Sequence, residues 1–284
     1  MSIPLNMVIA YHKYHALQND FFVVNQNFNK RQSSRLAKLI CNRKSGVGAD
    51  GIIYLAPSKK ADKKIDIFNA DGSWAEKSGN GLRIAGVHEY LVRRKKQKRN
   101  YFFETNSTID KVTIVKTARN CYTVKTELGT PLFETSMVPV KTKQKYMINT
   151  TLNVGGIKFP VTCLSIGNPH TVLFVDNFKF DWQTLGADIE KHRAFPNKTN
   201  VEFVKIINRR KIKVVGWERG AGATESSGTG AAAAVSAGVI MGVLERKCEV
   251  VFSTGSLFIQ LSNETNLIEL TGPVQTVARG TFEL

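Results

Sequence analysis

The sequence lacks the cysteine and histidine patterns that mark disulfide scaffolds and metal sites. Its four cysteines lie far apart, and no two of them have the short spacing of paired metal ligands. The five histidines are scattered and form no zinc signature. We therefore expect no bound metal, and buried free thiols at Cys41, Cys121, Cys163 and Cys248.

Long apolar runs are also absent. No stretch approaches the roughly 18 residues that cross a bilayer, although 42% of the residues are hydrophobic. The apolar stretch Met7–Ala10 is too short for a secretory signal, and no lysine or arginine precedes Lys13. The 284 residues are enough for one large domain or two ordinary ones. We expect a globular protein of the cytoplasm with no membrane partner.

Acidic residues are few beside basic ones, 23 against 40, which gives a formal charge of +17. Such an excess suggests nucleic acid, an anionic surface or an acidic substrate. The densest basic run, Arg93–Arg99, precedes the aromatic stretch Tyr101–Phe103, and a nucleic-acid patch could have this composition. So could a helix end that leads into a strand. Because no recognisable nucleic-acid module accompanies the run, we favour the helix end and expect no nucleic-acid partner.

Apolar patterning predicts alternating strands and helices. Strands are predicted at residues 21–25, 51–55 and 65–69, and helices at residues 33–41 and beyond Gly81. Short strands follow to about residue 140.

A polar stretch, Lys141–Thr151, carries no strong apolar period and predicts a boundary between two halves. We assign residues 1–140 to an N-terminal lobe and residues 141–284 to a C-terminal lobe. The last strand of the chain could return to the first lobe.

The second half repeats features of the first. Ser78-Gly79-Asn80-Gly81 and Ser227-Gly228-Thr229-Gly230 share the form Ser-Gly-x-Gly, and each precedes a small-residue helical stretch. Each serine follows a glutamate by two positions and an aromatic residue by ten, which are Glu76 and Phe68 in the first half and Glu225 and Trp217 in the second. Asn19 and Asn168 each lead into an apolar strand. The matched spacing predicts two duplicated lobes.

A Gly-rich turn at a helix start presents unpaired N–H groups and the positive end of the helix dipole. It therefore attracts a carboxylate and favours the anionic form of a nucleophile. Two lobes that face each other would bring two such turns to one cleft. An ordinary strand-to-helix turn is the alternative for each motif alone, but the matched pair of serines favours a functional site.

Several separated segments resemble the diaminopimelate epimerase family. They run in family order and are Lys13–Phe21, Gly46–Gly51, Phe68–Ser73, Gly79–Arg83, Gly167–His170, Asn200–Phe203 and Trp217–Gly220. The resemblance implies an α+β fold of two pseudo-symmetric lobes, each a curved antiparallel-rich sheet around a central helix. It also implies an isomerase of lysine biosynthesis that uses neither a metal, pyridoxal phosphate nor a nucleotide.

In that family a cysteine at each helix start acts on one face of the substrate's α-carbon. Ser78 and Ser227 hold those positions here. A cysteine has a reference pKa of about 8.5, which a helix start lowers further, whereas a serine hydroxyl ionises several units higher. A serine therefore needs an adjacent base. His170 and Glu218 are the candidates by family position, and His170 could instead only orient its loop.

The resemblance also implies which polar groups contact the substrate. In the family, residues at these places hold the amino-acid groups or the reacting carboxylate: Asn19, Asn69, Gly79, Asn80, Asn168, Asn200, Glu218, Arg219, Gly228 and Thr229. Arginine suits a carboxylate because its planar fork donates two parallel hydrogen bonds. The pocket is therefore expected to accept a small zwitterionic amino acid.

Other functions are compatible with the same residues. A divergent homologue could act on another amino acid as a racemase, isomerase or lyase, with Glu76 or Glu225 as its base. A silent amino-acid-binding protein would keep the pocket and lose turnover, and a nucleic-acid binder would rest on charge alone. We adopt the epimerase hypothesis, with activity in question because of Ser78 and Ser227. A homodimer and a monomer both remain open.

Overall fold

The computed structural model describes residues 7–26, 28–75, 78–93, 96–106 and 108–284. The chain forms two compact units: unit 1 is Met1–Thr126 with Gly272–Leu284, and unit 2 is Glu127–Thr271. The boundary expected at residue 140 lies inside unit 2. The division of the chain into lobes of residues 1–140 and 141–284 stays a prediction.

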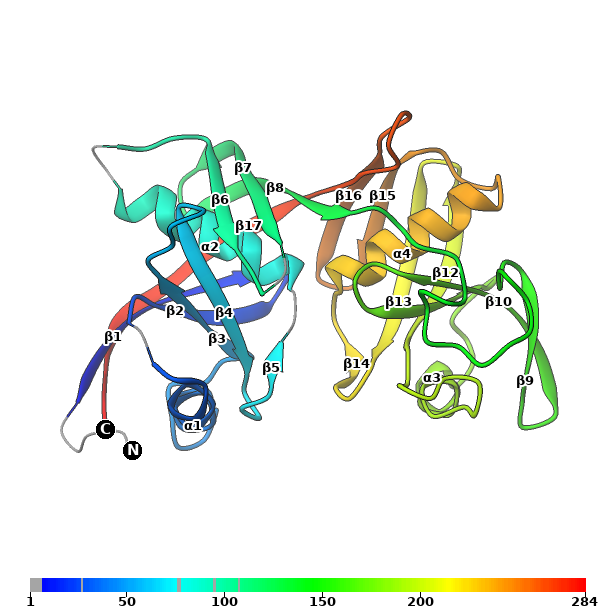
Figure 1. Ribbon diagram of the computed structural model, residues 1–284, viewed down its shortest axis with the longest axis horizontal. Helices are drawn as coiled ribbons and strands as arrows, with labels where there is room; N and C mark the ends of the chain where they lie inside the picture. Colours follow the sequence, from blue (N-terminus) through cyan, green and yellow to red (C-terminus); the bar gives the residue numbers. More distant parts are fainter. Residues whose placement is uncertain (1–6, 27, 76–77, 94–95, 107) are drawn as a thin grey trace. The chain divides into compact units, whose positions relative to one another are not determined.

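In unit 1 the strands close around one helix, α2 (Gly79–Val92) (Figure 1). Pairing runs from β1 through β2, β3, β4, β6, β7 and β8 to β17, and β17 pairs back with β1. The β2–β3 and β4–β6 pairs are parallel. The strands are β1 (Val8–Ala16), β2 (Asn19–Val24), β3 (Gly51–Ala56), β4 (Lys63–Asn69), β5 (Trp74–Ala75), β6 (Asn100–Glu104), β7 (Ile109–Ala118), β8 (Cys121–Gly129) and β17 (Ile268–Glu283).

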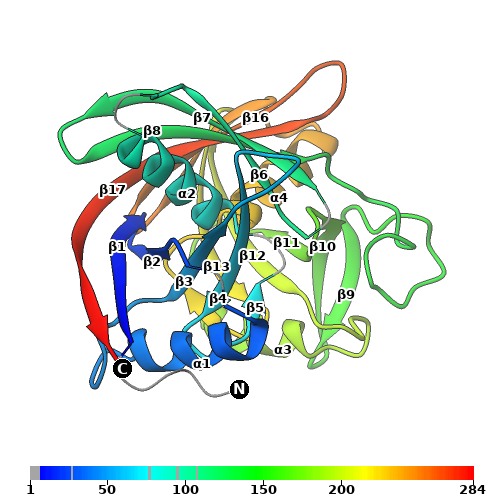
Figure 2. The same ribbon diagram turned by 60° about the vertical axis from the view of Figure 1, so that its left-hand side comes forward.

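Alternation along the strands gives unit 1 two separate cores. Val23 and Ile53 face α2 and pack with its Leu82 and Ile84. Their neighbours Phe22 and Ile52 face the other way and pack against α1 (Lys30–Ile40). Successive side chains of a strand point to opposite faces, so α1 and α2 cover opposite sides of β2 and β3 (Figure 2).

Unit 2 repeats this plan around α4 (Gly228–Ile240), which contacts strands β10, β11, β12, β13, β15 and β16. Its elements are β9 (Thr150–Val154), β10 (Ile157–Ser165), β11 (Pro169–Phe174), α3 (Trp182–Glu190), β12 (Asn200–Asn208), β13 (Lys211–Glu218), β14 (Gly222–Thr224), β15 (Lys247–Phe252) and β16 (Gly255–Leu261). The four alanines from Ala231 to Ala234 are fully buried. Small side chains on every face of α4 suit a helix that strands surround.

The pairing pattern makes the two units topological repeats. Strand β2 is parallel to β3 as β11 is to β12, and β4 is parallel to β6 as β13 is to β15. The short strands β5 and β14 pair antiparallel with β4 and β13, and each precedes the central helix of its unit. The predicted α+β fold of two pseudo-symmetric lobes is therefore confirmed.

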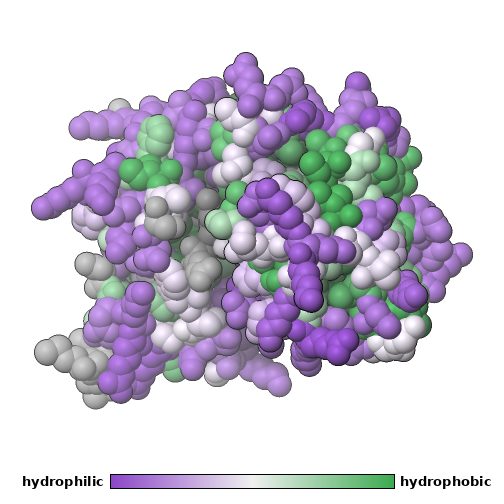
Figure 3. All heavy atoms as spheres, turned by 45° about the vertical axis from the view of Figure 1, so that its right-hand side comes forward, coloured by the Kyte–Doolittle hydropathy of each residue, from purple (hydrophilic) through white to green (hydrophobic). Residues whose placement is uncertain are grey.

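The basic run follows α2 and leads into β6, as the helix-end hypothesis requires. Arg93 Nε donates to Glu89 at 2.6 Å, and Lys98 Nζ lies 2.6 Å from Asp62. Two members of the run, Arg94 and Lys95, lie outside the described residues. Hydrophilic side chains cover most of the face shown in Figure 3, with separate hydrophobic patches between them.

Two further expectations concern thiols and membranes. All four cysteines are free, and three are buried, but Cys121 is only half-buried because it is the first residue of β8, directly after a turn. The expectation of a buried thiol is thus wrong for Cys121. Within the described part of the chain, no helix is long and apolar enough to span a membrane.

Candidate active site

Both central helices begin at the predicted serines. Ser78 and Ser227 are the N-caps of α2 and α4, with nearly equal extended backbones at φ −136° and −131°. Each hydroxyl accepts a hydrogen bond from the third helical N–H, Gly81 N at 3.0 Å and Gly230 N at 3.2 Å. A helix start leaves its first N–H groups without intrahelical partners. These belong to the predicted carboxylate-binding residues Gly79 and Asn80 in unit 1 and to Gly228 and Thr229 in unit 2.

Glycine at the third helical position packs closely against neighbouring side chains. A Cβ atom at Gly81 would lie 2.5 Å from Ile67 Cδ1, and one at Gly230 would lie 2.9 Å from Glu202 Oε1. A larger residue would therefore force the end of the Ile67 or Glu202 side chain to shift.

In unit 1 the predicted residues Asn19 and Asn80 form a hydrogen-bond chain that includes the buried Arg83. Asn80 Nδ2 donates to Asn19 Oδ1 at 2.9 Å, and Asn19 Nδ2 donates to Asp50 Oδ2 at 2.9 Å. Arg83 donates to Asn80 Oδ1 at 2.7 Å and to the Gly79 carbonyl at 3.2 Å. The structure thus joins Asn19 and Asn80 at the start of α2.

Arg83 is fully buried, and its Nε has no hydrogen-bond partner among the described residues. Burial lowers the pKa of its guanidinium to about 9. A positive charge held under the start of α2 adds to the positive helix end. The sequence analysis did not select Arg83, because an arginine within a helix is normally exposed on the protein surface.

Asn69 occupies a separate place in unit 1. It ends β4, and its Nδ2 donates to Ser73 Oγ at 2.9 Å. Ser73 Oγ in turn donates to Asp71. The described residues show no hydrogen bond between the Asn69 side chain and Asn19 or Asn80.

In unit 2 a buried His–Glu pair lies behind the predicted residues. His170 Nδ1 is 2.7 Å from Glu202 Oε1, and both side chains are almost inaccessible, at 0% and 3%. His170 Nε2 is 2.9 Å from Asn168 Oδ1, and Asn168 Nδ2 is 3.5 Å from Thr229 Oγ1. The structure therefore connects Asn168, His170 and Thr229.

The protonation of this pair is constrained by its partners. The Asn168 oxygen accepts only, so His170 Nε2 carries a proton. The bond at Nδ1 then needs one more proton, held by the imidazole or by Glu202. Burial raises the pKa of Glu202, while the facing imidazole opposes that rise. Glu202 Oε2 has no hydrogen-bond partner among the described residues. The buried pair therefore holds one proton between His170 Nδ1 and Glu202 Oε1.

Glu218 lies beside the second helix start. It ends β13, is half-buried, and accepts from Thr224 Oγ1 at 3.0 Å. Desolvation raises the pKa of Glu218, and hydrogen bonds from Thr224 and Ser227 lower it in part. A carboxyl with a raised pKa beside a hydroxyl is a candidate general base. By the repeat, the residue that ends β4 in unit 1 is Asn69, an amide.

Asn200 and Arg219 form a third group in unit 2. Asn200 is buried, donates to the Pro169 carbonyl at 2.8 Å and accepts from the Arg219 N–H at 2.9 Å. The exposed Arg219 side chain reaches the Asn197 carbonyl at 3.3 Å. Arg219 is therefore tethered through its backbone while most of its guanidinium donors remain available.

The structure separates the candidate bases. Both imidazole nitrogens of His170 are engaged by Asn168 and Glu202, and no bond between His170 and Ser227 occurs among the described residues. Glu225, the alternative base, accepts from Ser253 Oγ instead. Glu76 lies outside the described residues. Glu218 is thus the base that the geometry supports beside Ser227.

Sequence reasoning missed Glu202 and Thr224. Glu202 stands two positions after Asn200 in a segment that the family resemblance already includes. A carboxylate within an otherwise apolar strand, Val201 to Val204, was the available signal, since such groups are rarely buried without a partner. Thr224 gave no signal, because its contact with Glu218 depends on the turn between β13 and β14.

Comparisons with known proteins agree with this geometry. The family model described as diaminopimelate epimerase matches residues 11–133 and 162–277. A diaminopimelate epimerase of Carboxydothermus hydrogenoformans is 43% identical over 278 residues, covering 96% of this chain and 98% of the relative. One of Methanococcus maripaludis is 34% identical and covers 96% and 99%. A hydroxyproline epimerase structure from Agrobacterium vitis has a TM-score of 0.72 at 11% identity, covering 99% and 92%, and shows the shared fold.

Proposed function

Because the chain belongs to the diaminopimelate epimerase family, we propose that it acts on diaminopimelate as a cofactor-independent epimerase, inverting one α-carbon by proton transfer. The family recognised from the sequence is confirmed by the matching model and relatives. One observation carries the assignment of residues: each repeated unit uses a serine to cap its central helix. The sequence resemblance places the family's two catalytic cysteines at these positions.

We assign substrate binding to the groups around these caps. Within each unit, the free N–H groups at the start of the central helix suit a carboxylate. Asn19, Asn69, Asn168 and Asn200 supply amide groups for the substrate, and Arg219 has donors for the distal carboxylate. Buried Arg83 strengthens the positive end of α2.

Proton transfer is the step that serine makes difficult. A serine hydroxyl must lose its proton to a base before it can take one from carbon. Glu218 can serve Ser227 in this way, since its carboxyl has a raised pKa and contacts that hydroxyl. Asn69 takes the equivalent place in unit 1 and cannot act as a base. We therefore expect slow α-proton exchange that favours one epimer of the substrate.

The remaining predictions concern context. We place the reaction in lysine biosynthesis in the cytoplasm, with a small amino acid as substrate and no nucleic-acid partner. Light scattering of the purified protein in solution distinguishes a homodimer from a monomer. Retention on heparin at physiological salt would contradict the absence of nucleic-acid binding.

The test is proton NMR in deuterated water with LL-diaminopimelate, meso-diaminopimelate and a panel of other amino acids. Loss of an α-proton signal names the substrate. Exchange confined to a different amino acid would support a divergent racemase or isomerase. Binding without exchange, even after thiols replace both serines, would identify a silent amino-acid-binding protein.

A further inference from the structure

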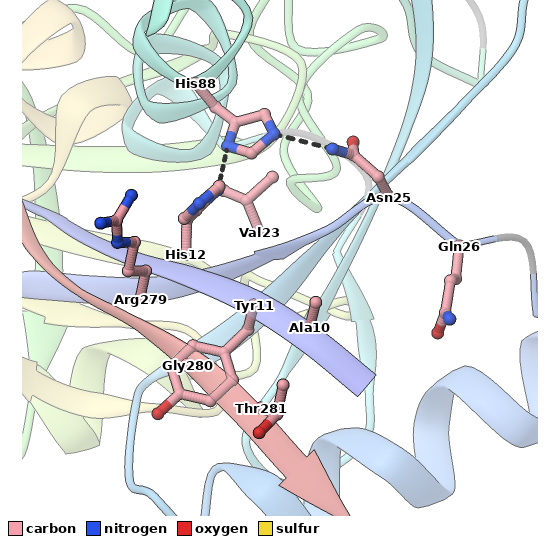
Figure 4. A pocket seen from close by; sticks show the side chains of 10 residues that line it. All are labelled: Ala10, Tyr11, His12, Val23, Asn25, Gln26, His88, Arg279, Gly280 and Thr281. Atoms are coloured by element: carbon pink, nitrogen blue, oxygen red, sulfur yellow. Dashed lines mark hydrogen bonds between the residues drawn. The ribbon is translucent and has the colours of Figure 1, made fainter. Parts of the chain in front are cut away.

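A cavity of about 450 Å³ lies in unit 1 among β1, β2, β17 and α2 (Figure 4). His12 and Arg279 face each other across the β1–β17 pair, and His88 reaches down from α2. Asn25 and Gln26 follow β2 and line the same cavity. None of these residues belongs to the candidate active site.

The two histidines, His12 and His88, form a small hydrogen-bond network. His88 is buried, with Nδ1 3.3 Å from His12 Nδ1 and 3.0 Å from Tyr14 Oη. His88 Nε2 is 2.9 Å from Asn25 Nδ2. Burial lowers the pKa of His88 to about 3, and electrostatic repulsion from His12 and Lys63 adds to the effect.

The charges around the cavity are all basic. Burial and then the Arg279 guanidinium lower the pKa of His12. No carboxylate lines the cavity within the described chain, and Arg279 forms no ion pair with any described residue. The polar groups that line the cavity are the Arg279 guanidinium, two imidazoles, two amides and the hydroxyls of Tyr11 and Thr281.

The fold does not require this cluster. In unit 2, Thr162 pairs with Val172 as His12 pairs with Val23 in unit 1. Ala237 follows the cap Ser227 by the same ten positions that separate His88 from Ser78. Unit 2 therefore fills the equivalent place with a threonine and an alanine. A basic cavity built from two histidines and an arginine is an addition to the repeat, and packing alone does not explain it.

We propose that this cavity is a second binding site, for a small dianionic oxyanion, held by Arg279 with His12 and the amide of Asn25. An arginine fork binds both phosphoryl and carboxylate oxygens. The Asn25 amide completes the set of donors. The anion supplies the negative charge that the cavity lacks, and it stabilises the protonated form of His12.

The test follows the imidazole signals of the full chain by NMR as a function of pH. Inorganic sulfate is the phosphoryl probe, because its charge is constant over the range, and succinate is the carboxylate probe. Sodium chloride at equal ionic strength is the reference. We expect saturable binding that raises the pKa of His12 by about one unit. The probe that does so at the lower concentration identifies the source of the oxyanion.

Two substitutions decide whether the site is specific. Arg279→Gln removes the exposed guanidinium without touching the core and should weaken probe binding at least about tenfold. Arg119→Gln removes an exposed arginine from a turn outside the cavity and should leave probe binding unchanged. In probe-free buffer Arg279→Gln should itself raise the pKa of His12, because a repelling cation is gone. Equal responses to chloride and both probes, or equal losses in the two variants, would overturn the proposal.

Discussion

His170 and Glu202 mark a difference between the two units at single residues. Phe21 and Ile53 hold the equivalent places in unit 1, by the register of the parallel strand pairs, and are buried and apolar. The fold can therefore accept an apolar pair at this position. The His–Glu pair is retained at an energetic cost, since burying charged groups costs free energy that their attraction rarely recovers.

The double variant His170→Phe with Glu202→Ile should consequently fold. We expect its free energy of unfolding to equal or exceed that of the parent by up to about 4 kcal/mol, while α-proton exchange is lost. Urea unfolding and the exchange assay measure the two effects. His170→Phe alone leaves a buried carboxylate unpaired and should cost about 3 kcal/mol or more. A double variant that keeps its exchange activity would show that the pair has no functional role. A double variant less stable than the single one would show that the pair is not held at an energetic cost.

Glu218 is predicted to act as the base for Ser227. Glu218→Gln keeps the shape and the hydrogen bond from Thr224 but removes the proton acceptor, so exchange should fall about 100-fold or more. The matched control is Glu225→Gln, since Glu225 bonds to Ser253. Both variants should bind substrate with similar affinity. An equal loss of exchange in the control would remove Glu218 from this role.

His88 should make the protein sensitive to acid. Its folded pKa is lowered to about 3 from 6.5, so the unfolded chain binds the proton more tightly. The resulting stability is complete above pH 6.5 and is lost as pH falls from 6.5 toward 3. The slope approaches about 1.4 kcal/mol per pH unit. His88→Gln should remove this slope between pH 6.5 and 5, as measured by urea unfolding, whereas His192→Gln should keep it.

At the scale of elements, the serines have a structural role that is independent of catalysis. Each caps its helix through the hydroxyl oxygen. Ser227→Ala should therefore lower the free energy of unfolding by about 1 kcal/mol, and Ser227→Asp should recover most of it. Thermal unfolding measures both. No loss in the alanine variant would mean that the cap contributes nothing, and serine would then need a catalytic explanation alone.

The central helices and their caps could be predicted from sequence because the signal is local. Ser-Gly-x-Gly and the helical spacing after Gly81 predicted the helix, which begins three residues earlier, at Gly79, because the glycine turn is itself its first turn. The partners of the amides could not be predicted in the same way. The bond between Asn80 and Asn19 and that between Glu202 and His170 join different elements, and their geometry depends on strand register.

At the scale of the molecule, the last strand belongs to both units. Residues 268–271 pair with β16 in unit 2, and residues 275–283 pair with β1 in unit 1. The sequence suggested such a return, but the position of the crossing follows from long-range pairing that no local pattern encodes. The polar stretch Lys141–Thr151, chosen as the boundary, lies within unit 2.

Truncation after Thr271 should therefore damage unit 1 selectively. It removes the partner of β1 and opens the ring of strands around α2. Amide hydrogen exchange should lose protection in β1, β2 and α2, while β11, β12 and α4 keep most of theirs. Uniform loss of protection in both units would contradict their description as separate compact units.

The central claim is that this chain has an epimerase site whose acid–base pair is serine instead of thiol. It is tested most directly by α-proton exchange of diaminopimelate in deuterated water, comparing the unmodified chain with Ser78→Cys, Ser227→Cys and the double variant. We predict that the double variant exchanges at least about 100-fold faster than the serine form, with either single variant in between. If no variant exchanges the α-proton of any amino acid tested, the account is wrong.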